Sequence, residues 1–136
     1  MDEREAELVS NSVAAAINRL PEYLLRLIEE VPVVLLDEPT DQMLIDLGID
    51  HADPDAKREI CGLHTGVPIT EESIESPTEL PSVIHLFRRG LAELARTGEG
   101  NIDRETLDNE VRITLLHELG HQFGLDEDDL ESLGYG

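Results

Sequence analysis

Two histidines and a glutamate stand close together in the segment HELGH, from His117 to His121. In a helix, residues four apart are separated by about 40° around the axis, so both imidazoles would lie on one face. That spacing lets them bind one tetrahedral zinc ion at nitrogen distances of about 2.0–2.1 Å. Glu118 is turned by about 100° from His117, so its carboxylate would stand beside the ion and could accept a proton from a metal-bound water. The segment therefore predicts a metal site with an adjacent general base.

The helix that must carry this segment is predicted over residues 103–123. HExxH on a helix is the signature of zinc peptidases, with the histidines as ligands and the glutamate as base. A stripe of apolar residues at four-residue intervals faces away from both histidines; it consists of Val111, Leu115, Leu119 and Phe123. The helix is thus expected to have a buried back and a separate histidine face. The alternative interpretation is a capped helix that merely contains two histidines.

A third ligand is expected shortly after the helix. Gly124 stands three residues past His121, where a left-handed residue can end the helix and turn the chain back towards the metal. Glu127 follows three residues later, and a carboxylate binds zinc at about 2.0–2.2 Å. Glu127 is the predicted third ligand, Asp126 is the close alternative and Asp128 comes third. The rest of the run DEDDLE is interpreted as the solvated start of a helix.

Three protein ligands would leave the fourth position of one zinc ion to a water molecule, whose pKa zinc lowers towards about 7. Glu118 would take a proton as that water attacks a peptide carbonyl. The prediction is a zinc-dependent metallopeptidase acting on a peptide or protein substrate that lies along an edge of the sheet, in CGLHTG or SVIHLFRR. The alternative is a zinc-binding interaction module without catalytic activity. A zinc endoribonuclease would need a three-histidine spacing and a basic face, which the sequence lacks.

Several other residues could do chemistry but are expected to be structural. Cys61 is interpreted as a half-buried strand residue rather than a nucleophile. The same structural interpretation applies to the remaining histidines, although His64 could line the cleft; they are His51, His64 and His85. Tyr135 is considered as an oxyanion donor but is expected to pack or fray instead.

The composition excludes some partners. The chain has 136 residues, with 31 acidic side chains against 10 lysines and arginines, a net charge of −21. It has two Phe, two Tyr and no Trp, so both its charge and its lack of stacking surface argue against nucleic acid, and its charge against anionic membranes. The acidic start lacks signal-peptide features, and no apolar run reaches the ~20 residues of a membrane span. The single cysteine fits a reducing compartment, so we expect a cytoplasmic location; the oligomeric state stays open.

The chain is predicted to form a single domain over residues 1–136. Apolar periodicity and breakers predict helices at residues 2–20 and 21–30, a strand at 31–39 and a short helix at 40–49. Residues 50–59 are predicted as a loop, 61–70 as a strand, 71–81 as a loop and 82–89 as a strand. Residues 90–101 should form a short helix or turn before the final helix. One helix-rich layer on a small sheet is the simplest α+β arrangement.

The sequence resembles the minimal zincin family of small bacterial zinc metallopeptidase-like proteins. The resemblance rests on VRITLLHELGHQFGL with the acidic ending DEDDLESLGY, on HLFRRGLAEL, and on the layout of LPEY, VVLLDEP and GLHTGVPIT. It implies a compact fold of a few helices on a small mixed sheet, with one zinc ion held by His117, His121 and the acid at position 127. That acid is most often aspartate in the family, and a further histidine often follows the second one. Here these positions hold Glu127 and Gln122, so Asp126 stays open as a ligand.

Overall fold

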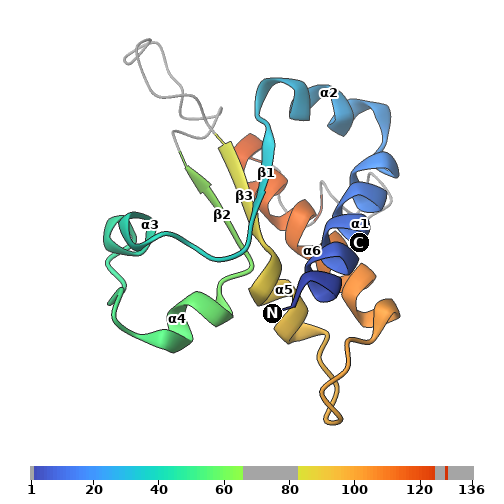
Figure 1. Cartoon of the computed structure of the whole chain (residues 1–136). Helices are drawn as coiled ribbons and strands as arrows, with labels where there is room; N and C mark the ends of the chain where they lie inside the picture. The colour runs from blue at the N-terminus through green and yellow to red at the C-terminus, as the bar shows by residue number, and fades with distance from the viewer. Residues whose placement is uncertain (1, 66–82, 125–127, 129–136) are drawn as a thin grey trace.

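The structure is a computed structural model that describes residues 2–65, 83–124 and 128, apart from the side chains at 63–65, 122 and 123. Its elements run in the order α1 (Glu3–Asn18), α2 (Glu22–Glu30), β1 (Val33–Leu36), α3 (Asp41–Asp46), α4 (Pro54–Glu59), β2 (Gly62–Thr65), β3 (Val83–Phe87), α5 (Arg88–Leu94) and α6 (Arg104–Phe123). Figure 1 shows the strands side by side at the centre, with α3 and α4 at one end and α1 and α2 on the other side. The α+β class predicted from the sequence is confirmed.

The first two helices begin as their sequences predict. Asp2 is the N-cap of α1, and its side chain accepts a hydrogen bond from the backbone N–H of Glu5. Pro21 stands immediately before α2, where its missing N–H and fixed φ are harmless to the helix. Strand β1 follows directly, so the predicted succession of helix, helix and strand is confirmed.

The described sheet has three strands in the order β1-β3-β2. β1 runs parallel to β3 and β2 antiparallel to it, so the sheet is mixed, as expected. In the register Val33 pairs with Ile84, and Gly62 pairs with Leu86. Pro32 lies just before β1, and its carbonyl accepts a hydrogen bond from Ile84. A proline beside an edge strand agrees with the sequence interpretation, since proline donates no ladder hydrogen bond.

The predicted loop at residues 50–59 is wrong, because residues 54–59 form α4. Asp53 caps this helix by accepting a hydrogen bond from Asp55 N–H, and Pro54 occupies its first turn. Arg58 then binds Asp55 one turn earlier at 2.7 Å. The helix is only six residues long and lacks an apolar stripe, so its polar sequence looked like a loop.

The predicted strand at residues 82–89 is too long at its end. The chain leaves β3 at Phe87 and enters α5 at once with Arg88. Gly90 permits this turn, because a Cβ there would lie 2.2 Å from the carbonyl oxygen of Ile60. The backbone of α5 therefore lies directly against the segment that leads into β2.

The main core lies between the sheet and the helices α1, α2, α5 and α6. Ile84 and Leu86 enter it from β3, and they are fully buried. A separate buried group lies outside that core cluster and consists of Leu44 of α3, Ala56 of α4 and Phe87 of β3. Phe87 alternates with Leu86 along the strand, so its side chain lies on the opposite face of the sheet from the main core.

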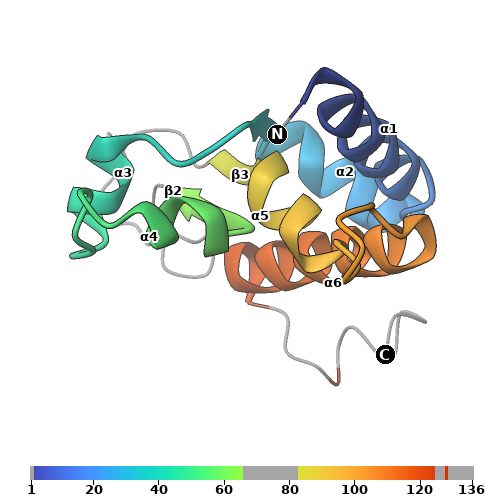
Figure 2. The same ribbon diagram turned by 60° about the horizontal axis from the view of Figure 1, so that its bottom comes forward.

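Helix α6 is defined sharply at both ends. Asp103 caps it by accepting a hydrogen bond from Thr106 N–H, and Gly124 ends it with φ 67° and ψ 25°. Near its start, Asp108 Oδ1 accepts a hydrogen bond of 2.6 Å from the Ser12 hydroxyl of α1. Figure 2 shows α6 running beneath α5 and past α1 to the strands. Among the described helices, none combines the length and apolarity that a membrane span requires.

Candidate metal centre

Helix α6 presents three neighbouring rows of side chains, each with a spacing of four residues. The first row is buried in the core and consists of Leu107, Val111, Leu115 and Leu119. The second faces the β2 side and consists of Glu110, Thr114 and Glu118. The third is exposed and consists of Ile113, His117 and His121. For Val111, Leu115 and Leu119 this order confirms the predicted buried back and separate histidine face, while the side chain of Phe123 lies outside the described part.

The two histidine rings lie next to each other on the exposed row. Their centroids are 4.4 Å apart and their planes are inclined by 47°. Both residues are exposed, so neither is a core histidine. Two neutral imidazoles at this separation can direct one nitrogen each at a common ion after small side-chain rotations, which fits zinc.

Glu118 differs from its histidine neighbours because it is buried, with 9% of its surface exposed. Its side chain lies against Gly62 of β2, where a methyl group in place of the glycine hydrogen would stand 3.0 Å from Glu118 Cγ and 3.3 Å from Oε1. The methyl group of Thr114 closes the same contact, also at 3.0 Å. The carboxylate therefore lies between the strand and the histidine row. A base in this position is shielded by β2 on one side and belongs to the row of α6 next to the histidines.

The predicted third ligand cannot be placed, because Glu127 and Asp126 lie outside the described residues. Asp128 is described and exposed. Within the described part of the chain, no three metal-binding side chains of the types His, Cys, Asp and Glu come together. The donor set that α6 supplies is thus two imidazoles, and the left-handed Gly124 redirects the chain immediately after them.

The sheet decides between the two segments considered for the strand edge. β3 is central and is hydrogen-bonded on both sides, so it cannot pair with another strand. β2 lies at the edge and pairs only with β3 among the described strands. It also carries Gly62, which contacts Glu118. Of the two candidates, only the CGLHTG segment combines an edge with proximity to the site.

His85 lies on the opposite face of the sheet from α6. It alternates with Ile84 and Leu86, which point into the core shared with α6, and it stacks on Phe87 with centroids 6.2 Å apart. Its Nδ1 is buried without a hydrogen-bond partner in the described structure, and burial lowers the pKa of its imidazole. It is therefore half-buried and structural, as predicted.

The other candidates have separate surroundings. His51 is exposed in the turn before α4. His64 lies in β2 with its backbone paired to Ile84, but its side chain is outside the described part, as is all of Tyr135. Cys61 is half-buried just before β2, and burial raises the pKa of its thiol to about 11, helped by the nearby Glu110 carboxylate. A thiol of this kind is a poor nucleophile at neutral pH, which agrees with the sequence interpretation.

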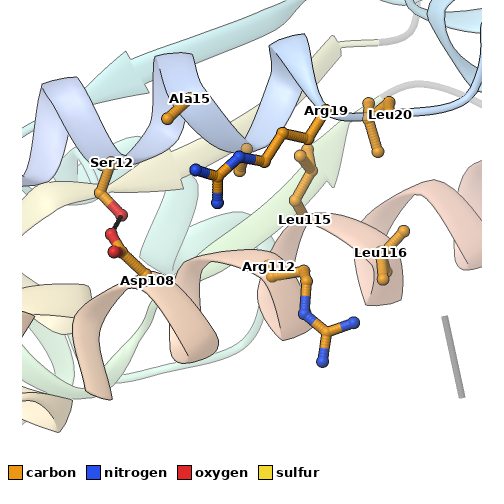
Figure 3. A pocket seen from close by; sticks show the side chains of 9 residues that line it. Ser12, Ala15, Arg19, Leu20, Asp108, Arg112, Leu115 and Leu116 are labelled. Atoms are coloured by element: carbon orange, nitrogen blue, oxygen red, sulfur yellow. Dashed lines mark hydrogen bonds between the residues drawn. The ribbon is translucent and has the colours of Figure 1, made fainter. Parts of the chain in front are cut away.

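A cavity of about 80 Å³ lies between α1 and α6, on the other side of the buried row (Figure 3). Alanine and leucine side chains from both helices line it together with Arg19 and Arg112, and the Ser12–Asp108 hydrogen bond closes one end. None of the three motif residues lines this cavity. It belongs to the packing of the two helices rather than to the candidate metal centre.

Gly62 and Thr114 were not identified from the sequence as parts of the site. A glycine within a strand can indicate that another group approaches the backbone closely, and this signal was present in CGLHTG. What approaches could not be inferred, because Gly62 and Glu118 are far apart along the chain.

Comparison with known families supports the zinc interpretation of this geometry. The family model described as zincin-like metallopeptidase matches residues 28–136, which include β1, the edge strand β2 and all of α6. No curated protein was found to match the chain. The matched region covers most of the sequence and ends beyond the motif helix, so the chain belongs to the zincin-like metallopeptidase family.

Proposed function

We propose that this protein is a zinc-dependent peptidase in which His117, His121 and Glu127 hold one zinc ion and Glu118 is the general base. The observation that carries the proposal is the placement of a buried carboxylate between an edge strand and two exposed imidazoles 4.4 Å apart. Family membership supports a metallopeptidase of this kind.

The side chains of α6 have different proposed roles according to the row in which they lie. The two imidazoles, on the exposed row, would hold the metal together with the acid after Gly124. When bound, zinc would polarise the peptide carbonyl and acidify a water molecule. The Glu118 carboxylate would accept a proton from the attacking water and later pass it to the leaving amine. Gly62 lies against one side of the Glu118 side chain and limits where its carboxylate can move. The proton would therefore be transferred to a carboxylate held in a narrow range of positions.

The outer edge of β2 is the proposed place for the substrate. An extended peptide could add to this edge through main-chain hydrogen bonds, which give affinity without demanding a particular sequence. β2 is four residues long in the described structure, so the paired stretch of substrate would be short. The exposed Ile113, one turn before His117 on the same row, could offer an apolar contact to a bound peptide.

The charge of the chain suggests which peptides it accepts. With a net charge of −21, the protein repels acidic peptides at low ionic strength and attracts basic ones. We expect cleavage of basic peptides to weaken as salt is added, because exposed charges are screened within about 10 Å at 0.1 M. The cytoplasmic location, and the absence of nucleic acid and membrane partners, remain predictions from composition.

Zinc titration of the metal-free protein is the first test. We expect one tight equivalent in the wild type and at least about a 100-fold loss of affinity in His121→Ala. His51→Ala is the matched control, since it removes an exposed histidine distant in sequence and should leave zinc affinity unchanged. If neither the wild type nor the control binds zinc tightly, the metal site does not exist.

Turnover of a mixed peptide library then separates the peptidase from the zinc-binding interaction module. We expect Glu118→Gln to retain zinc and lose at least about 100-fold in kcat, the contribution that a positioned acid–base group makes. Zinc binding without any turnover of the wild type would support the non-catalytic alternative. Full activity of Glu118→Gln would exclude Glu118 as the base.

A further inference from the structure

Helix α6 approaches the edge strand closely at Gly62. A Cβ at this position would meet Glu118 Cγ and Thr114 Cγ2 at 3.0 Å each, closer than ordinary van der Waals contact, and Glu118 Oε1 at 3.3 Å. By contrast, a Cβ at Gly98 would meet nothing within 4 Å. A side chain at position 62 would be crowded, because Thr114 and Glu118, on two neighbouring turns of α6, fill the space where its Cβ would lie.

The two neighbours would respond differently to an added methyl group. Thr114 is β-branched and has two preferred χ1 rotamers in a helix, so its methyl group has few positions to which it can move. Glu118 has an unbranched side chain and could rotate, but one side of it is closed by the strand. An added methyl group would press on this side chain at both Cγ and Oε1. A substituent at position 62 would thus displace the carboxylate rather than merely compress the core.

We propose that Gly62 is a positioning residue that sets where the Glu118 carboxylate lies. This inference rests on the proposed function for its catalytic consequence, but the contact between the two residues can be tested without zinc. Strand β2 fixes Gly62 through its register with Leu86, and α6 is fixed by its buried row. The packing of β2 against α6 then sets the position of the Glu118 side chain on its strand-facing side.

The contact is tested by thermal unfolding of the metal-free protein in a double-mutant cycle. We expect Gly62→Ala to lower the Tm, and Glu118→Ala to relieve part of that loss, so that the double variant is more stable than the sum of the single changes. A second cycle with Thr114→Ser should show coupling as well, since serine lacks the contacting methyl group. Gly98→Ala combined with Glu118→Ala is the control and should be additive. Additive behaviour of Gly62→Ala with Glu118→Ala would overturn the proposal.

The positioning role is tested by the kinetics of the zinc-loaded protein. We expect Gly62→Ala to lower kcat by about tenfold or more, with KM and zinc affinity changed by less than about twofold. Gly62→Ala/Thr114→Ser distinguishes the two contacts, since relief at Thr114 should restore the Tm but not kcat. If that variant restores both, Gly62 serves helix packing alone and the proposal is wrong.

Failure of the proposed peptidase function and failure of the positioning role of Gly62 would give different results. An inactive wild type would refute the proposed peptidase and with it the catalytic consequence, while the metal-free cycle would still decide whether Gly62 places the carboxylate. An active wild type with unchanged kcat in Gly62→Ala would refute the positioning role and leave the peptidase standing.

Discussion

Arg96 and Glu5 form a bidentate ion pair that joins the turn after α5 to the first turn of α1. Arg96 Nη1 lies 2.9 Å from Glu5 Oε2, and Nη2 lies 3.1 Å from Oε1. Less than a third of either side chain is exposed. Arg96 also donates to the carbonyl oxygen of Gly100, so a single guanidinium holds the 95–103 turn against α1. Two parallel hydrogen bonds of this kind fix geometry as well as charge.

This pair should make stability depend on pH in the acid range. The hydrogen bond from Arg96 is the main cause that lowers the pKa of Glu5 below its ordinary value of 4.5. Because the pKa of Glu5 is lower in the folded than in the unfolded protein, the ion pair stabilises the fold at pH values above the pKa of the unfolded state. This stabilisation is lost as the pH falls through the pKa of Glu5 in the folded state. We expect Glu5→Gln to lower stability at pH 7 by about 1 kcal/mol, or about 3–5 °C in Tm, and to have much less effect near pH 3. Thermal unfolding at both pH values checks this, with the exposed Glu7→Gln as a control of equal charge. An equal loss at both pH values would contradict it.

The third zinc ligand can be assigned by substituting the acids after Gly124 one at a time. We expect Glu127→Ala to lower zinc affinity by at least about 100-fold, because a ligand carboxylate is removed. Asp126→Ala and Asp128→Ala should change it by less than about threefold. The measurement is competition with a chelator of known affinity. A large loss in Asp126→Ala alone would move the assignment to Asp126.

The end of α6 should be sensitive to a Cβ at Gly124. Its φ of 67° lies in the left-handed region, and its N–H caps the carbonyl of Gly120. We expect Gly124→Ala to lower the free energy of unfolding by about 1 kcal/mol. Gly124→Asn should lose less, since asparagine tolerates this conformation. Denaturant unfolding of the metal-free variants measures both. Equal stability of Gly124→Ala and the wild type would show that the helix end readily adjusts.

The thiol of Cys61 should be slow to react in the folded protein. With a pKa of about 11, roughly one thiol in a thousand is ionised at pH 8, against about a quarter for an ordinary cysteine. We expect a disulfide reagent to modify the native protein at least about 100-fold more slowly than the protein unfolded in guanidinium chloride. Comparable rates in the two states would show that the thiol is not buried as described.

The sequence predicted helix α6 and its faces better than their surroundings. The faces of α6 follow from a periodicity of four in Val111, Leu115 and Leu119, and its ends from Asp103 and Gly124. Such signals are read within one helix and need no knowledge of the fold. The short helix at residues 54–59 was missed because its Asp-Pro start is equally typical of a turn.

The contacts between distant segments could not be predicted in the same way. Nothing local in CGLHTG or SVIHLFRR distinguishes an edge strand from a central one, so the choice required the order β1-β3-β2. The burial of Glu118 likewise depends on Gly62, which approaches from another element. Which residues of α6 share a face was predictable, whereas the element that packs against each face was not.

The three rows of α6 restrict how this protein can change in length. Inserting one residue between Asp108 and His117 would turn the end of the helix by about 100° relative to its start. The histidines would then rotate out of the exposed row while the cap and the Ser12–Asp108 hydrogen bond stayed in place. Related sequences should therefore keep a fixed number of residues from Asp108 to the motif. Additions and deletions should instead fall at Gly98 and Glu99, which are exposed at the tip of the turn between α5 and α6.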